Sequence, residues 1–235
     1  MPIRLTLPAR GTLTPNDAHD PLPYYYHPWV GWLYRHRLQM GLDLLPAIPR
    51  GRVLEVGVGS GVLVPTLTAH YAEYTGTDLT LARGLERLVA PGCQATFREV
   101  DLLRDGDLPA DHFDAIVCFS VLEHIRDSEG AARGLARALK RGGTLVAGYP
   151  AVSPLMSRAF EVIGFPGIDA HHVSPPAQIQ AALGHAPALE RLDRVAFPPG
   201  APVPLALYQC TAWTKGPSGS AAGLGPPAGP PSLAR

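Results

Sequence analysis

Hydrophobic and polar residues alternate along the chain with two different periods, and each period predicts one kind of element. Short apolar runs bounded by glycine, proline or acidic residues predict buried strands. The clearest run is FDAIVCF at 113–119, which is apolar and partly β-branched and contains no glycine or proline. The predicted strands are 52–56, 73–77, 95–100, 113–119, 144–148, 189–197 and 205–213.

Longer segments repeat their apolar residues every three or four positions and predict helices between the strands. Ser60 is placed to act as the N-cap of the first of them. The segment KRG at 140–142 would end a helix with two cations and a glycine. That helix carries one apolar stripe, formed by Ile125, Ala132, Leu135, Ala136 and Leu139. The predicted helices are 60–70, 80–89, 125–139, 154–163 and 176–183.

Strands that alternate with helices predict an α/β fold with a mostly parallel sheet and right-handed crossovers. The last two predicted strands have no helix between them and therefore predict an antiparallel pair. The pattern predicts one domain over 24–215. Residues 1–23 contain five prolines and predict an irregular arm, and 216–235 hold ten Gly or Pro in twenty positions and predict a disordered tail.

The first segment of the domain, 24–46, opens with three tyrosines and then predicts a helix. A helix packed on the sheet accounts for its apolar positions. A lid over a bound ligand is the alternative hypothesis, which the unusual tyrosine run suggests. The stripe consists of Val30, Tyr34, Leu38, Leu42 and Leu45.

Charge and composition narrow the class of protein further. Twenty basic and twenty acidic residues balance to a formal net charge of zero, which argues against nucleic acid as a partner. No apolar run is long enough to span a bilayer, and the first residues lack an apolar signal core, so we expect a cytoplasmic protein. Cys93, Cys118 and Cys210 are far apart and match no metal spacing, so no metal site is predicted.

The segment VLEVGVGSG at 53–61 carries the first sign of chemistry, because a strand runs into three spaced glycines and then into a helix. Gly57, Gly59 and Gly61 allow a sharp turn and let a ligand approach the backbone. Mobile loops also collect glycine, so this motif alone is a weak signal.

Two aspartates at later strand ends strengthen the hypothesis. Asp78 follows the second strand, where a carboxylate can reach the hydroxyls of a ribose, and Asp101 follows the third, where it can accept from an exocyclic amine. Leu79 and Leu102 come next and suit the faces of a flat base. Each aspartate could instead cap the segment that follows it. Together with the glycine loop, they predict an adenosine-containing ligand.

The glycine spacing distinguishes between ligands of that class. A dinucleotide fingerprint places its third glycine one position later, at 62, where this chain has valine. The spacing therefore favours a ligand other than NAD.

At this point the sequence resembles the class I S-adenosylmethionine-dependent methyltransferases, and most closely the small-molecule branch that includes quinone-biosynthesis methyltransferases. The resemblance covers 51–150 and implies a Rossmann-like fold, a seven-stranded mostly parallel sheet with helices on both faces and an antiparallel last strand. Val58 departs from the family, which often has Cys or Ala there. The motifs that carry the resemblance are VLEVGVGSG, TGTDLT, REVDLL, FDAIVCFSVLEHI and LKRGGTLVAGYP.

The resemblance also implies a set of cofactor-binding residues. The methionine part of S-adenosyl-L-methionine would lie along Glu55 and the glycine loop, Asp78 would bind the ribose hydroxyls, and Asp101 the adenine amine. Leu79 and Leu102 would flank the adenine, and Ser120 would lie beside the sulfonium. The full predicted set is Glu55, Gly57, Gly59, Ser60, Gly61, Asp78, Leu79, Asp101, Leu102 and Ser120.

Methyl transfer from a sulfonium needs alignment of the two reactants, and it needs a base only where the acceptor must lose a proton. The candidate bases are His124, after the fourth strand, His171 and His172, in a Gly/Pro-flanked loop after the fifth, and the tyrosines Tyr24 to Tyr26. Each histidine could equally be structural or solvated. Adjacent histidines rarely point the same way, so they do not suggest a metal site.

These observations predict a methyltransferase that uses S-adenosyl-L-methionine to methylate a small, apolar or aromatic acceptor by in-line transfer. Two alternatives stay open, a non-catalytic protein that binds the same cofactor for regulation and an NAD-type oxidoreductase. The identity of the acceptor, the atom methylated and the oligomeric state have no signal in the sequence.

Overall fold

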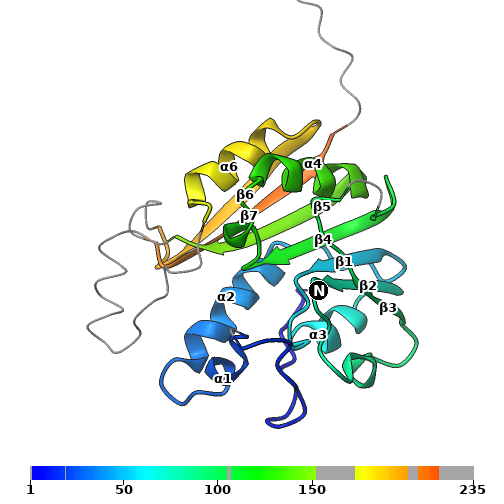
Figure 1. Ribbon diagram of the computed structural model, residues 1–235, viewed down its shortest axis with the longest axis vertical. Helices are drawn as coiled ribbons and strands as arrows, with labels where there is room; N and C mark the ends of the chain where they lie inside the picture. The colour runs from blue at the N-terminus through cyan, green and yellow to red at the C-terminus, as the bar shows by residue number, and fades with distance from the viewer. Residues whose placement is uncertain (1, 19, 105–106, 152–172, 201–205, 217–235) are drawn as a thin grey trace, which may run out of the picture.

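The computed structural model describes residues 2–18, 20–104, 107–151, 173–200 and 206–216. The predicted helix 154–163, His171, His172 and the predicted tail from 217 onward lie outside the described residues. Within them, the chain forms one seven-stranded sheet (Figure 1). The strands are β1 (Arg52–Val56), β2 (Glu73–Asp78), β3 (Gln94–Glu99), β4 (Phe113–Phe119), β5 (Leu139–Pro150), β6 (Leu189–Phe197) and β7 (Tyr208–Lys215).

The strands lie in the order β3-β2-β1-β4-β5-β7-β6. The first five are parallel, and β7 runs antiparallel to both β5 and β6. This confirms the predicted α/β fold, including the antiparallel end of the sheet. The chain builds outward from β1 through β2 to β3 and then crosses back to β4, so the strand order reverses between β1 and β4. Ligands in open α/β sheets bind at the carboxyl ends of strands beside such a reversal.

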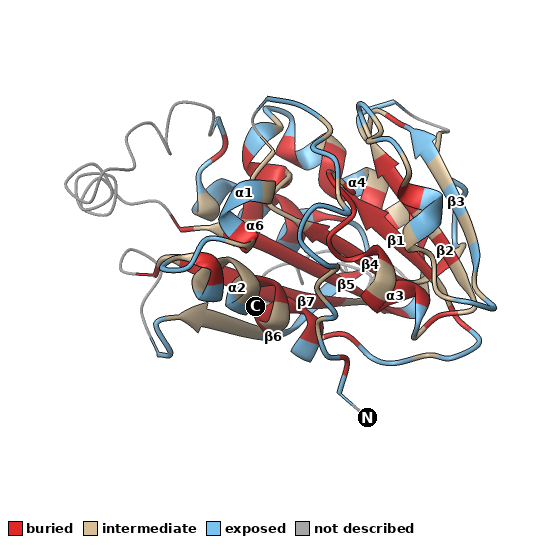
Figure 2. Ribbon diagram, turned by 90° about the horizontal axis from the view of Figure 1, so that it is seen from below, coloured by how far each residue is buried: buried red, intermediate tan, exposed pale blue. Residues whose placement is uncertain are grey.

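Helices cover both faces of the sheet (Figure 1). One face, which holds Leu54 and Ile116, packs against α4 (Ser128–Ala138) and α6 (Pro176–His185). The other face, which holds Val53, packs against α2 (Gly31–Asp43) and α3 (Val64–Thr68), with α1 (Leu22–Tyr25) on the same side. Neighbouring residues of a strand point to opposite faces, so the central strands are buried on both sides (Figure 2).

Two predicted helices are shorter than their sequence pattern indicates. The helix predicted over 60–70 is only α3, which begins after Leu63, so the prediction that Ser60 is its N-cap is wrong. Pro65 lies in the first turn of α3, where a missing N–H group costs little. The segment predicted as helix 80–89 forms only one 3₁₀ turn, η1 (Leu85–Leu88), because Gly84 has a left-handed backbone at φ +80°.

The predicted helix 125–139 also has different bounds. Asp127 caps α4, since its side chain accepts the N–H of Gly130 at 2.8 Å, and Ile125 lies before the helix. Residues 140–142 do not end the helix but belong to β5. Leu139 pairs with Phe113 of β4, so sheet pairing takes over directly where the helix stops.

The N-terminal arm, residues 2–18 and 20, is irregular in backbone but is bonded to the domain. The side chain of Ile3 is fully buried in the core beneath α2 and α3. The N–H of Thr6 donates to Oγ1 of Thr66 at 2.8 Å, and the hydroxyl of Tyr26 donates to the carbonyl of Pro8 at 2.8 Å. No described helix is long and apolar enough to cross a membrane.

Candidate functional site

The glycine loop follows β1 at the carboxyl edge of the sheet, next to the strand-order reversal. Gly57 has a φ of +80°, and a Cβ built on it would lie 2.1 Å from Cγ2 of Val121, which follows β4. Any side chain at Gly57 would therefore push apart the two loops that leave β1 and β4. The lack of a side chain at Gly57 lets the two loops lie in close contact.

Four N–H groups of this loop, those of Gly57, Val58, Gly59 and Gly61, bond within the protein. Those of Gly57 and Val58 both donate to the carbonyl of Thr77, at 2.8 and 3.0 Å. The N–H of Gly59 donates to Oδ2 of Asp78 at 2.8 Å, and that of Gly61 to the carbonyl of Val58 at 2.9 Å. Loops that bind pyrophosphate direct such N–H groups at the ligand. This loop is therefore a poor cradle for a dinucleotide.

Asp78 ends β2 beside the loop, where its two carboxylate oxygens accept the N–H groups of Gly59 and Leu79, each at 2.8 Å. Burial raises the pKa of Asp78, and the backbone N–H groups oppose that shift. The backbone N–H of Thr80 also bonds to this carboxylate. A carboxylate offers about four lone-pair sites, so one site stays open for a ligand hydroxyl. The side chain of Leu79 is exposed beside it.

Asp101 follows β3 at the same edge, two strands from the glycine loop. Its Oδ1 accepts the N–H of Leu103 at 3.0 Å, and Arg104 lies 3.8 Å from its Oδ2 in an exposed ion pair. Leu102 is partly buried against the core on the α4 side. The parallel register therefore places Asp78 and Asp101, the two aspartates predicted to bind adenosine, after the ends of adjacent strands.

Ser120 follows β4 with a φ of +56°, a left-handed backbone that non-glycine residues seldom adopt. Its N–H donates to the carbonyl of Gly148 at 2.7 Å, and its hydroxyl lies 3.2 Å from the hydroxyl of Tyr208. Such strain persists only where surrounding structure holds it, and it concentrates at functional sites. Ser120 lies at the strand-order reversal, directly after β4.

Glu55 lies in a different environment from the rest of the predicted set. Its carboxyl group is buried on the α3 side of the sheet, where the hydroxyl of Tyr74 donates to its Oε2 at 2.6 Å. Burial raises the pKa of Glu55 to about 8, and the hydrogen bond from Tyr74 opposes the shift. The structure therefore places this side chain in the core below the loop rather than at the edge itself.

The turn after Ser120, η2 (Leu122–His124), places two neighbouring titratable residues in different environments. His124 is exposed, whereas Glu123 is 2% exposed and its Oε2 has no hydrogen-bond partner. Burial raises the pKa of Glu123 to about 8, and the nearby Arg37 opposes the shift. Successive residues of a 3₁₀ turn point about 120° apart, so only one of the two can face inward.

Arg37 of α2 is a half-buried cation beside this turn, and its Nε atom is buried without a hydrogen-bond partner. Its Nη2 donates to the hydroxyl of Tyr25 at 3.0 Å, and its guanidinium carbon lies 4.4 Å from the ring centroid of Tyr34. The ring centroid of Tyr208, the first residue of β7, lies 5.6 Å from that carbon. The guanidinium therefore links α2 to the start of β7, close to the turn that follows β4.

Comparison with known proteins identifies the family. A family model described as a methyltransferase domain matches residues 33–183. The chain belongs to this family of methyltransferase domains.

Two relatives illustrate the similarity of this methyltransferase domain to studied sequences. A ubiquinone biosynthesis O-methyltransferase of Alkalilimnicola ehrlichii is 31% identical over 47% of this chain and 46% of its own length. A phosphatidylethanolamine N-methyltransferase of Cereibacter sphaeroides is 35% identical over 41% of this chain and 49% of its own. The chain spans about half the length of the curated relatives it matches.

Solved structures share the fold. The N-methyltransferase NodS of Bradyrhizobium japonicum, in complex with S-adenosyl-L-homocysteine, has a TM-score of 0.58 at 20% identity, covering 84% of this chain and 92% of that one. A Listeria monocytogenes protein described as a putative S-adenosylmethionine-dependent methyltransferase has a TM-score of 0.62 at 14% identity, covering 79% and 99%. At these identities the likeness shows the fold alone.

Sequence reasoning missed two charged residues at this edge of the methyltransferase domain, the half-buried Arg37 and the buried Glu123. Arg37 had a usable signal, since it lies three residues after Tyr34 and seven after Val30, on the apolar stripe of its helix. A cation in such a stripe must be buried with partners or lie in a site. Glu123 had no such signal, because the sequence alone does not say which of two adjacent polar residues faces inward.

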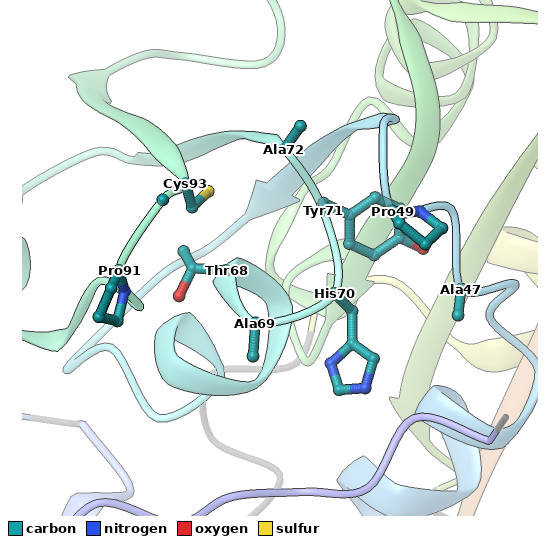
Figure 3. A pocket seen from close by; sticks show the side chains of 10 residues that line it. Ala47, Pro49, Thr68, Ala69, His70, Tyr71, Ala72, Pro91 and Cys93 are labelled. Carbon is teal, nitrogen blue, oxygen red and sulfur yellow. The ribbon is translucent and has the colours of Figure 1, made fainter.

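The methyltransferase domain also has a hollow at its opposite edge (Figure 3). It measures about 280 Å³ and is lined by residues that precede β1, β2 and β3, among them Pro49, His70 and Cys93. Parallel strands put their amino ends at the edge away from the glycine loop, so this hollow is separate from the candidate site. Among the described residues, no group of three His, Cys, Asp or Glu is arranged to hold a metal.

Proposed function

We propose that this chain is an S-adenosylmethionine-dependent methyltransferase that transfers a methyl group in line to a small, apolar or aromatic acceptor. The family of the domain supports the reaction class. The observation that carries the choice of cofactor is the electrostatic character of the glycine loop. Four of its N–H groups bond within the protein, and the carboxylates of Asp78 and Asp20 both lie near Gly59.

That arrangement suits a cationic ligand. S-adenosylmethionine carries a sulfonium and an ammonium group against one carboxylate, whereas a nicotinamide dinucleotide carries an anionic pyrophosphate. Anions near carboxylates lose binding energy, and cations gain it. The alternative of an NAD-type oxidoreductase is therefore disfavoured by the charge of the loop as well as by its spacing.

The residues present fit the proposed cofactor part by part. Asp78 would bind a ribose hydroxyl with its open lone pair, and Asp101 with Leu79 and Leu102 would hold the adenine. Arg37 offers the cofactor carboxylate a half-buried guanidinium whose Nε has no partner. The cofactor supplies a methyl group on a sulfonium, already activated for displacement, so the protein's part is alignment and the exclusion of water.

Some acceptors must also lose a proton, and the structure suggests a different general base from those predicted from the sequence. His124 is exposed, whereas the buried carboxyl of Glu123 has an oxygen without a partner. Its pKa, raised to about 8, lies close to neutral pH, which favours general-base catalysis. We propose Glu123 for this role; His171 and His172 stay predictions.

Support for the acceptor class comes from the relatives, one named for ubiquinone biosynthesis and one for phosphatidylethanolamine. These relatives are named for O- and N-methylation respectively, so the proposal specifies the class of acceptor and not the methylated atom. The aromatic residues Trp29 and Trp32, 81% and 52% exposed beside α2, suit an apolar molecule approaching this side of the domain.

Competition for the site tests the proposal directly. We expect calorimetric titration to show binding of S-adenosylhomocysteine and none of NAD, and expect Asp78→Ala to weaken that binding at least about tenfold, because it removes charge-assisted hydrogen bonds. Binding of NAD alone would contradict the cofactor assignment. Incubation with methyl-labelled cofactor and a metabolite extract then distinguishes an enzyme, which labels an acceptor, from a regulatory binding protein, which labels none.

A further inference from the structure

We infer that Asp20, on the N-terminal arm, belongs to the cofactor site and favours a positively charged sulfur over a neutral one. This inference rests on the proposed function, because it concerns how the same site distinguishes S-adenosylmethionine from S-adenosylhomocysteine. The two molecules differ by one methyl group and the positive charge that it places on the sulfur.

The position of the Asp20 side chain is set by bonds to the glycine loop and to the arm itself. Its Oδ1 accepts the hydroxyl of Ser60 at 3.2 Å and the N–H of Leu22 at 2.8 Å. Its Oδ2 accepts the N–H of Asn16 at 3.2 Å and lies 3.7 Å from where a Cβ on Gly59 would stand. The carboxylate therefore lies over the middle glycine of the loop that the cofactor must contact.

The arm is bonded on both sides of the site. Nδ2 of Asn16 donates to the carbonyl of Thr80 at 3.3 Å, just past β2. Closer to the chain start, Thr6 is hydrogen-bonded to Thr66 of α3, and Ile3 is buried. The dark-blue arm runs past α3 before it enters α1 (Figure 1). Asp20 thus sits on a segment with bonds to both loops of the candidate site.

The negative charge of Asp20 lies close to that of Asp78. Asp78 accepts the N–H of Gly59, and Asp20 lies against the same glycine, so two carboxylates lie near one residue; the charge of Asp17, on the arm, also acts on Asp78. Neither Asp78 nor Asp20 forms an ion pair with a cation among the described residues. Like charges so placed repel, and a cation bound between or beside them relieves the repulsion. The sulfonium is the cation that distinguishes the cofactor from its product.

Asp20 lies outside the part of the chain that the family model matches. The family model begins at residue 33, and the arm with Asp20 precedes it.

The test compares two ligands on the whole chain. Titrations of S-adenosylmethionine and S-adenosylhomocysteine are run on the wild type, on Asp20→Asn and on Asp193→Asn, a matched control on β6 at the far end of the sheet. Asp20→Asn removes one nearby negative charge, so we expect the ratio of the affinity for S-adenosylmethionine to that for S-adenosylhomocysteine to fall at least about threefold. We expect the variant to retain its thermal stability and the control to match the wild type.

Each outcome bears on one claim. An unchanged ratio in Asp20→Asn, or an equal loss for both ligands, would overturn the inference. A wild type that binds neither ligand would instead defeat the proposed function. Ser60→Ala removes one of the three donors to this carboxylate and leaves the N–H groups of Leu22 and Asn16, so we expect the ratio to fall in the same direction by a smaller amount. The double variant should add little to Asp20→Asn, and full additivity would contradict the shared mechanism.

Discussion

At the scale of single residues, Glu55 shows how a motif position can serve the fold. Its carboxyl is buried and accepts a hydrogen bond from Tyr74, and its pKa is raised to about 8 by burial. In an unfolded chain the same group titrates near about 4.3. Between those two values the folded chain keeps a proton that the unfolded chain releases. Stability therefore falls as pH rises through this window, and the loss is complete above about pH 8.

We expect Glu55→Gln to leave stability nearly unchanged at pH 5 and to raise it at pH 8 by roughly 1–3 kcal/mol, because glutamine keeps an acceptor for Tyr74 without the buried charge. Thermal unfolding at both pH values measures the difference. Glu190→Gln, an exposed change of the same kind on β6, is the control and should shift neither. Equal effects of Glu55→Gln at the two pH values would show that the carboxyl does not titrate in this window.

Residues of the candidate site differ in how far the sequence reveals them. The glycines, Asp78 and Asp101 could be predicted because each follows a strand in sequence, and parallel strands bring such positions to one edge. Asp20 could not be, since it lies 40 residues before Ser60 and nothing local links the two. Glu123 became visible only through burial, which depends on elements distant in the chain, whereas Arg37 lies on the apolar stripe of its helix and could have been noticed there.

At the scale of elements, the N-terminal arm is stabilised by tertiary contacts despite having no regular structure of its own. Ile3 is fully buried in the core beneath α2 and α3. We expect Ile3→Ala to lower the free energy of unfolding by about 2–4 kcal/mol, since it leaves a cavity in that core. Leu192→Ala, where the side chain is 60% exposed on β6, should cost less than about 0.5 kcal/mol. Denaturant unfolding compares them, and similar small values for both would show that the arm does not contribute to the core.

The helices were predicted less accurately than the strands, for a local reason and a tertiary one. Gly84 adopts a left-handed backbone and limits the predicted helix 80–89 to one turn. Leu139 continues the apolar stripe of the predicted helix but pairs with Phe113 in the sheet. This pairing starts β5 at Leu139 and includes 140–142, the residues predicted to end the helix. Hydrophobic spacing indicates which face is buried but not where pairing begins.

At the scale of the whole molecule, the sheet has a protected centre and exposed edges. β4 has hydrogen-bonded neighbours on both sides and packed side chains on both faces, whereas β3 pairs only with β2 and is largely exposed. We expect amide exchange to be at least about tenfold slower over 113–119 than over 94–99, because β4 opens only in larger unfolding events. Hydrogen exchange read by mass spectrometry on peptides from both strands measures this. Equal rates would mean that the sheet opens as one unit.

The sequence by itself determined the strands, their alternation with helices and the polar residues that follow strand ends, because these depend on periods of two or 3.6 residues and on local turns. Tertiary structure alone decided which distant segments meet at the candidate site. The arm lies over the glycine loop, a half-buried arginine links α2 to the start of β7, and a glutamate faces inward where its neighbouring histidine does not. Those contacts arise from packing between elements, and no local pattern encodes the identity of a partner tens of residues away.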